Sequence, residues 1–204
     1  RRRSRKEDTR MAFKVGVFVG SLSKKSINRR LARALKTLSP DQMELVEIPI
    51  GDLPLYNYDF DNNYPPEGRA FKKAVEAVDA LMFVTPEYNR SIPGPLKNAI
   101  DWGSRPYGKN SFAKKPSAVI GTSPGSISTA VGQQHLRSIL SYVNSPELAQ
   151  PEAYIQFTDN LITEDGEVTD ESTKAFLREW LDAFEVFIGK VTTAERGEPA
   201  EQGS

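Results

Sequence analysis

Short apolar segments and segments with helical spacing alternate along the chain. The apolar segments are bounded by turn residues and are too short for buried helices, which predicts buried strands over residues 13–19, 45–48, 80–85, 117–121 and 153–157. In the segments that follow them, apolar residues recur every three or four positions. This spacing predicts helices over residues 27–38, 71–78, 93–102, 128–143 and 171–191.

The alternation predicts one α/β domain built on a five-stranded parallel sheet. A crossover between parallel strands is right-handed and lays its helix against a face of the sheet, so helices are expected on both faces. In such an open sheet, ligands bind beyond the carboxyl ends of the strands, near the point where the strand order reverses. The loops after the first, third and fourth strands are therefore the candidate binding segments.

The chain of 204 residues divides into a core and two terminal segments. Residues 1–10 carry six basic and two acidic side chains, and we expect either a basic arm or a stretch added to the natural protein, with Met11 as the natural start. Residues 11–193 form the predicted domain. Residues 194–204 are polar, contain Gly and Pro and have no apolar period, which predicts a disordered tail.

Composition excludes several kinds of chemistry. The absence of cysteine excludes a disulfide framework, a thiolate metal site and a cysteine nucleophile, and the single histidine leaves too few imidazoles for a histidine-rich metal site. The 27 basic and 27 acidic residues balance, so no net charge favours nucleic acid or an anionic membrane. No apolar run approaches the ~20 residues of a membrane span, and no signal peptide is evident. We expect a cytoplasmic protein that binds neither nucleic acid nor membrane.

The loop after the first strand, GSLSKKSIN at residues 20–28, is rich in hydroxyl, amide and cationic side chains. It lies at the start of a helix, where backbone N–H groups and the helix dipole favour an anion. Its single glycine departs from both the P-loop and the dinucleotide fingerprint, which favours a terminal monophosphate. The alternative is that Ser26 only caps the helix and the lysines are simply solvated.

The other two candidate loops differ in how strongly their residues indicate a binding site. Residues 86–102 contain three prolines, an aromatic residue and several polar groups, and a stiff backbone of this kind suits the edge of a planar heterocycle. Within it, Lys97 and Asp101 have the spacing of a simple surface ion pair. Residues 121–128, GTSPGSIS, are small and hydroxyl-bearing, a pattern common in strand-to-helix turns.

These loops carry a resemblance to a known family. Gly20-Ser21-Leu22 with Ser26 and Asn28, together with Pro86-Glu87-Tyr88-Asn89, Ser91, Pro93-Gly94 and LKNAIDW at residues 96–102, resemble the NADPH-dependent FMN reductase family, above all its bacterial quinone and chromate reductase branch. The resemblance covers most of residues 13–191. It implies a flavodoxin-like three-layer sandwich, bound FMN, and a homodimer or homotetramer with the flavin near the subunit interface.

The resemblance also implies which residues hold the cofactor. The FMN phosphate would contact the first loop, and the isoalloxazine would lie along the second loop with the third at its border. The cofactor-binding residues implied are Ser21, Ser23, Ser26, Ile27, Asn28, Pro86, Glu87, Tyr88, Asn89, Ser123 and Gly125.

This sequence departs from the family pattern at two places. Ser23 stands where the branch commonly has arginine, so Lys24 or Lys25 would neutralise the phosphate. Ser128-Thr129 stands where a glycine pair is usual, which would change the shape of the wall that the third loop forms beside the flavin ring.

The implied activity is hydride transfer from NADPH or NADH to FMN N5, followed by transfer of two electrons to a quinone; chromate, azo dyes and ferric chelates are further candidate acceptors. Because the flavin carries the chemistry, no catalytic side chain and no metal are expected. Tyr88 would flank the ring or plug the core, His135 would lie at a helix surface or an interface, and Arg105 would form an interface ion pair or meet an anionic substrate.

Two other functions fit an α/β sheet of this kind. A one-electron flavodoxin-type carrier would benefit from a charged docking surface, which the near-neutral core does not favour. A phosphoacceptor signalling domain needs acidic residues after the first and third strands to hold Mg²⁺, where this chain has Gly20-Ser21 and Pro86-Glu87.

Overall fold

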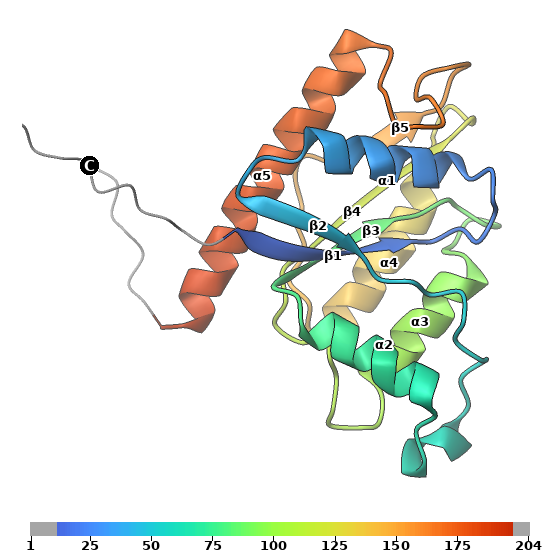
Figure 1. Ribbon diagram of the computed structural model, residues 1–204, viewed down its shortest axis with the longest axis vertical. Coiled ribbons are helices and arrows are strands. Elements are labelled where there is room, and N and C mark those ends of the chain that lie inside the picture. Colours follow the sequence, from blue (N-terminus) through green and yellow to red (C-terminus); the bar gives the residue numbers. More distant parts are fainter. Residues whose placement is uncertain (1–11, 198–204) are drawn as a thin grey trace, which may run out of the picture.

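The computed structural model describes residues 12–197 and consists of a central parallel sheet between two layers of helices (Figure 1). The elements in chain order are β1 (Phe13–Val19), α1 (Ile27–Leu38), β2 (Met43–Glu47), a 3₁₀ helix (Tyr58–Asn62), α2 (Pro66–Glu76), β3 (Ala80–Val84), α3 (Gly94–Ser104), β4 (Ser117–Ser123), α4 (Ala130–Tyr142), β5 (Tyr154–Gln156) and α5 (Glu171–Glu195). This arrangement confirms the predicted five-stranded α/β fold.

The sheet has the strand order β2-β1-β3-β4-β5, and all neighbouring strands pair in parallel. From β1 the chain first adds β2 on one side and then crosses to β3 on the other, so the order reverses between β1 and β3. The registers align Val19 with Val84 and Val84 with Ile120. The carboxyl ends of β1, β3 and β4 therefore lie side by side.

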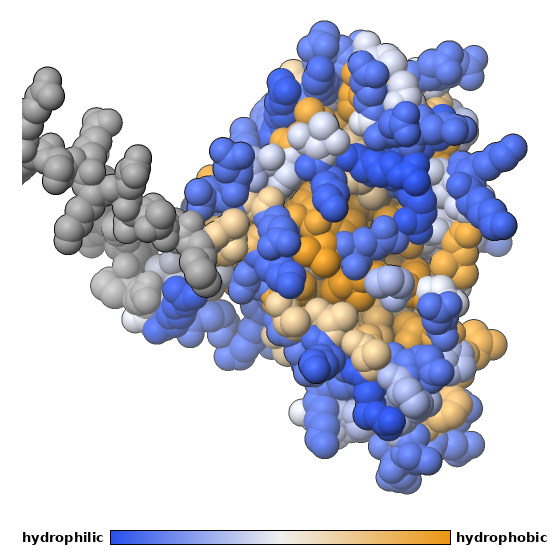
Figure 2. Space-filling view, viewed as in Figure 1, coloured by the Kyte–Doolittle hydropathy of each residue, from blue (hydrophilic) through white to orange (hydrophobic). Residues whose placement is uncertain are grey.

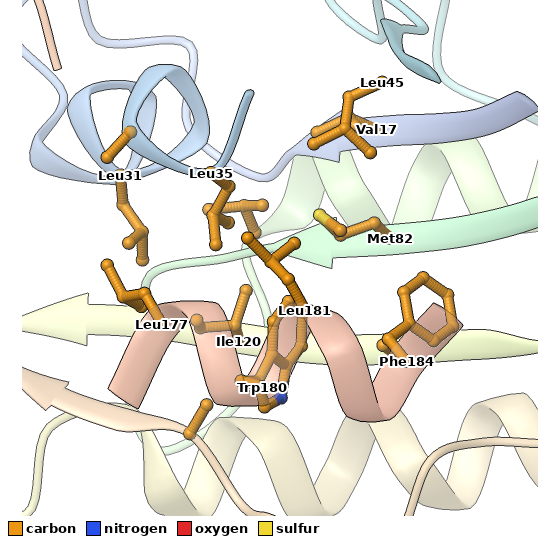
Figure 3. Close-up of a cluster of buried hydrophobic side chains, with 14 of the residues drawn as sticks. Val17, Leu31, Leu35, Leu45, Met82, Ile120, Leu177, Trp180, Leu181 and Phe184 are labelled. Atoms are coloured by element: carbon orange, nitrogen blue, oxygen red, sulfur yellow. The ribbon is translucent and has the colours of Figure 1, made fainter. Parts of the chain in front are cut away.

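Each face of the sheet has its own apolar layer. On one face, α1 and α5 bury Leu31, Leu35, Trp180 and Phe184 against strand residues such as Met82 (Figure 3). On the other face, α2, α3 and α4 pack against the remaining strand side chains, among them the stacked pair Phe18 and Phe83, whose ring centroids are 4.9 Å apart. The two layers anchor the strands and so fix the edge from which the loops project.

Several element boundaries differ from the sequence prediction. Helix α5 ends at Glu195, two residues inside the predicted tail of residues 194–204, and the Glu195 carboxylate lies 2.9 Å from Lys114 Nζ at this end of the helix. Strand β4 runs two residues further, to Ser123, because Thr122 and Ser123 pair with β5. The 3₁₀ helix over Tyr58–Asn62 lies between the second predicted strand and the second predicted helix, where the apolar pattern predicted no element.

The expectations for residues 1–10 and for the end of the tail fall on residues 1–11 and 198–204, which lie outside the described residues. Among residues 12–197, no helix has the length and apolar character that crossing a membrane requires.

Candidate functional site

The three candidate loops leave the sheet next to one another. Gly20 N–H donates to the Val84 carbonyl at 2.9 Å, and Thr85 N–H donates to the Ile120 carbonyl at 3.0 Å. A Cβ at Gly20 would lie 2.5 Å from Thr85 Oγ1, and a Cβ at Gly121 would lie 2.2 Å from the Thr85 carbonyl oxygen. Only glycine permits strands to pack this closely at their ends, so the sequence brings the three loops to one edge.

The loop after β1 holds its hydroxyl groups in fixed positions. Ser21 Oγ accepts from Ser23 N–H, and Ser26 Oγ accepts from Arg29 N–H, both at 3.2 Å. Because each oxygen accepts a bond from the backbone, each hydroxyl hydrogen remains available to an anion. Among the described residues, the N–H groups of Ser21 and Leu22 find no acceptor. The loop therefore caps α1 through Ser26 and also presents free donors.

Asn28, expected at the FMN phosphate, also has a structural role within the chain. Its side chain is fully buried, its Oδ1 accepts from Thr122 N–H at 3.0 Å, and its Nδ2 donates to the Thr122 carbonyl at 3.0 Å. The amide thus pairs with β4 as a neighbouring strand would, and it ties α1 to the start of the third loop. One hydrogen of Nδ2 is left for a further acceptor.

The loop after β3 turns back on itself immediately beyond the strand. Tyr88 and Ser91 form an antiparallel bridge, with Tyr88 N–H donating to the Ser91 carbonyl at 2.9 Å. The residues between them, Asn89 and Arg90, have φ of 50° and 65°, a left-handed conformation that is strained for arginine. The turn exposes 47% of Tyr88, so this side chain is not a core plug.

Glu87 connects the second loop to the helix after the third. Its carboxylate accepts from Gly132 N–H at 2.8 Å, in the first turn of α4, and lies 3.7 Å from Arg90. A carboxylate at a helix N-terminus satisfies an orphan N–H and interacts favourably with the helix dipole. Glu87 therefore fixes the distance between two walls of the candidate site.

The loop after β4 contains the same kind of hydrogen bond as the first loop, from a backbone N–H to the hydroxyl of the serine two residues before it. Ser123 Oγ accepts from Gly125 N–H at 3.2 Å, as Ser21 does from Ser23. Ser128, with φ of 50°, is buried and donates to the Ile155 carbonyl at 2.7 Å. Ser128, the first residue of the pair that departs from the family pattern, thus anchors this loop to β5, while Gly125 stays exposed.

Each loop also presents an apolar side chain to solvent. Leu22 is 53% exposed, Tyr88 47% and Ile127 50%. An exposed apolar residue is ordinary when isolated, but here one comes from each of three loops that leave adjacent strands. Together with the free donors of the first loop, they suit a ligand that has an apolar, planar part and an anionic part.

The expected cofactor residues therefore fall into two groups. The first group is at the surface or half-buried within the three loops: Ser23, Ile27, Pro86, Glu87, Tyr88, Asn89, Ser123 and Gly125. The second group is buried: Ser21, Ser26 and Asn28. Sequence reasoning missed the bonds from Asn28 to Thr122 and from Glu87 to Gly132, because residues 94 and 45 positions apart leave no local pattern.

Two residues with open roles have partners within the chain. Arg105 pairs with Asp61, donates to Tyr56 Oη at 3.0 Å and lies over the Tyr58 ring at 5.3 Å. Burial, with a further contribution from the Asp61 hydrogen bond, raises the pKa of Tyr56.

His135 Nδ1 lies 3.1 Å from Ser91 Oγ, which places it beside the second loop. The predicted pair Lys97 and Asp101 is formed at 2.7 Å on an exposed face.

Among the residues the structure describes, no group of three histidine or acidic side chains is arranged to hold a metal ion.

Comparison with known proteins identifies relatives that match over nearly their whole length. A 2-hydroxy-1,4-benzoquinone reductase from Burkholderia sp. is 44% identical over 178 residues, which is 87% of this chain and 97% of that protein. A quinone reductase from Pseudomonas putida is 44% identical over 177 residues, which is 86% of this chain and 95% of that protein.

A solved structure is similar as well. The flavoenzyme NAD(P)H:(acceptor) oxidoreductase from Paracoccus denitrificans superposes with a TM-score of 0.84 at 46% identity, covering 88% of this chain and 98% of that one. The family model of the NADPH-dependent FMN reductases matches residues 13–159, a range that includes all three loops. The chain belongs to the NADPH-dependent FMN reductase family, whose members are oxidoreductases that use FMN and NAD(P)H.

Proposed function

We propose that this protein oxidises NAD(P)H and reduces quinones with FMN bound across the carboxyl ends of β1, β3 and β4. The observation that carries the proposal is the convergence of three loops at the reversal point of the sheet, each with an exposed apolar side chain and the first with free hydrogen-bond donors. The quinone reductases that are 44% identical to this chain support the choice of acceptor.

In this proposal the first loop binds the FMN phosphate. The Ser21 and Ser26 hydroxyls and the unpaired N–H groups of Ser21 and Leu22 donate to its oxygens, since an oxyanion is best satisfied by several such donors. Lys24 and Lys25 are exposed beside these groups and offset the phosphate charge. Asn28 acts by holding this loop against β4.

The second and third loops position the ring. The rigid turn between Tyr88 and Ser91 offers its backbone at one edge, and Ser123 and Gly125 border the other. When bound, FMN supplies the hydride acceptor and the electrons that pass to the quinone. The chain itself orients NAD(P)H and the quinone against the flavin ring and keeps one face of that ring open. Holding the reactants in position in this way accounts for the rate enhancement.

The test is an anaerobic reduction. We expect the purified protein to show the visible absorption of flavin, to lose it on addition of NADPH and to regain it when 1,4-benzoquinone follows. A protein that takes up no added FMN, or whose absorption does not change with NADPH, contradicts the proposal. Reduction only in the presence of a separate reductase would instead identify a one-electron carrier.

We further propose a homodimer or homotetramer and chromate as an additional acceptor. Three large apolar side chains in the segments next to α3, Leu55, Tyr58 and Tyr107, are 84%, 72% and 88% exposed, which supports association because exposed apolar patches often mark interfaces. Light scattering measures the assembly, and chromate consumption in the same anaerobic assay measures the second activity. A cytoplasmic location remains a prediction from the sequence.

A further inference from the structure

The only histidine of the chain lies against the second loop. His135 is exposed on α4, three residues after Gly132, and its Nδ1 lies 3.1 Å from Ser91 Oγ. Among the described residues, this hydroxyl has no other hydrogen-bond partner. The pair therefore joins a titratable side chain at the surface to a half-buried hydroxyl that is free to bond a second group.

The Ser91 hydroxyl belongs to the turn that borders the candidate site. Ser91 forms the backbone bridge with Tyr88, whose aromatic side chain is exposed at the site. A Cβ at Gly132 would lie 2.9 Å from the Ser91 carbonyl oxygen and 3.2 Å from Glu87 Cγ, so the start of α4 packs directly on this turn. Both hydrophobic and hydrophilic side chains reach the surface along the edge from which the loops project (Figure 2). In the proposed function this turn lies along the flavin ring, where the quinone is reduced.

Reduction of a quinone requires a proton as well as electrons. The reductant gives up a hydride, which brings two electrons and one hydrogen, whereas the hydroquinone contains two added hydrogens. Each turnover therefore converts NAD(P)H, one proton and a quinone into NAD(P)⁺ and a hydroquinone. A side chain that delivers this proton accelerates the reaction as a general acid, and histidine is the residue type whose ordinary pKa lies closest to neutral pH.

The other ionisable groups near the turn are less suited to this task. Glu87 is the only acidic residue between the ends of β1, β3 and β4 and the helices that follow them, and its carboxylate accepts from Gly132 N–H and lies near Arg90. A guanidinium does not release its proton in proteins, and a tyrosine hydroxyl such as that of Tyr88 is a far weaker acid than an imidazolium. His135 is thus the proton donor that the geometry offers.

We propose that His135 delivers a proton to the quinone through the Ser91 hydroxyl, an inference that rests on the proposed function. The Ser91 O–H gives its hydrogen to a quinone oxygen, and Ser91 Oγ takes a proton from His135 Nδ1. The imidazole then regains a proton from water, because its ring is exposed. No side chain is oxidised or reduced, and both electrons come from NAD(P)H.

A change of acceptor isolates the proton step. Benzoquinone takes up protons when it is reduced, whereas ferricyanide takes up an electron alone. His135→Gln keeps a group that can hydrogen-bond to Ser91 but cannot titrate. We expect it to lower kcat/KM for benzoquinone at pH 7 by about tenfold or more, while ferricyanide reduction and the bleaching of the flavin by NADPH change little.

A matched variant on the same helix is the control. Ser138→Ala, exposed one turn from His135, should alter the reduction of neither acceptor. Ser91→Ala should reproduce the selective loss of His135→Gln, and the double variant should lose no more than either single one. An equal loss with benzoquinone and ferricyanide, or no loss with benzoquinone, would overturn the proposal.

The proton source is also observable without turnover. In the FMN-loaded protein reduced with dithionite, the C2–H resonance of His135 can be followed by NMR as the pH changes, and no second histidine overlaps it. Glu87 and Arg90 are the charged groups that face the pair from the second loop, and the α4 positions one turn away, Val131, Gly132, Ser138 and Ile139, are uncharged.

The NMR midpoint should agree with the kinetic one. We expect kcat/KM for benzoquinone to fall as the pH rises, with a midpoint equal to that of the His135 resonance, and to lose this dependence in His135→Gln. Midpoints that differ by more than about one pH unit would show that another group supplies the proton, and the proposal would be wrong.

The two levels of proposal fail in different ways. If the parent protein reduces no quinone, the proposed function is wrong, and the proton route is wrong with it. If the parent reduces benzoquinone and His135→Gln does so equally well, the function stands and only the proton route is wrong.

Discussion

At the scale of single residues, the candidate site depends on side chains that form hydrogen bonds with the backbone of neighbouring elements. Asn28 forms hydrogen bonds with both the backbone N–H and the backbone carbonyl of Thr122, and Glu87 binds the first turn of α4. These contacts set the spacing of three loops before any cofactor arrives. A preorganised site of this kind loses less entropy on binding, because its walls are already in place.

Replacing Asn28 should therefore weaken the fold as well as the site. Asn28→Ala leaves the N–H and carbonyl of Thr122 unpaired in a buried position, and we expect a loss of about 2–4 kcal/mol in the free energy of unfolding. Urea denaturation of the flavin-free protein measures it. Asn62→Ala, at an exposed position, should stay within about 0.5 kcal/mol of the parent. Equal stability of Asn28→Ala and the parent would show that the Thr122 contact is not needed.

At the scale of elements, the sequence predicted more of the scaffold than of the site. Apolar runs and helical spacing identified all five strands and the five α-helices, because both layers of the core are built from local periodic patterns. The ends of elements were less well predicted. Helix α2 begins at Pro66 rather than near Phe71, since its first turn is polar and a proline at N1 provides the start signal instead.

The loop geometry had no comparable local signal. The motif around Pro86 located the second loop, but the positive φ of Arg90 could not be read from a residue type that normally avoids it. Likewise, the hydrogen bond from Arg33 to the Glu164 carbonyl joins residues that lie 131 positions apart in the chain. The sequence indicated which loops meet, and the structure was needed to identify the long-range hydrogen bonds that fix their spacing.

Helix α5 provides a pH-dependent contribution to stability. Hydrogen bonds from the Ser172 hydroxyl at 2.6 Å and from Thr173 N–H at 2.7 Å lower the pKa of the capping Asp170 below its usual 3.8. A carboxyl group whose pKa is lower in the folded state stabilises the fold above its unfolded pKa, and this stability is lost as the pH falls through the folded value.

The variant Asp170→Asn keeps a capping side chain that does not titrate. We expect the difference in unfolding free energy between the parent and this variant to be constant from about pH 7 to pH 5 and to shrink below about pH 4. Denaturant unfolding at a series of pH values measures this difference. If the difference were the same at every pH, Asp170 would not be held as a charged cap.

At the scale of the whole molecule, the fold separates stability from function. Two apolar layers stabilise the sheet, and the edge where the strand order reverses is left to the loops (Figure 1). This division is general in open α/β proteins, and here it lets a chain without cysteine act as an oxidoreductase. In the proposed function, the polar first loop binds the phosphate end of FMN, and the apolar tips of the three loops border its ring at another part of that edge.

The most direct test compares the affinity of the protein for FMN with its affinity for riboflavin, which lacks only the phosphate. Flavin fluorescence titration should show FMN binding to the parent protein at least about tenfold more tightly than riboflavin. Ser21→Ala should weaken FMN and leave riboflavin unchanged, whereas Ser141→Ala, exposed on α4, should alter neither. Equal affinity of the parent for the two flavins would contradict a phosphate site in the loop after β1.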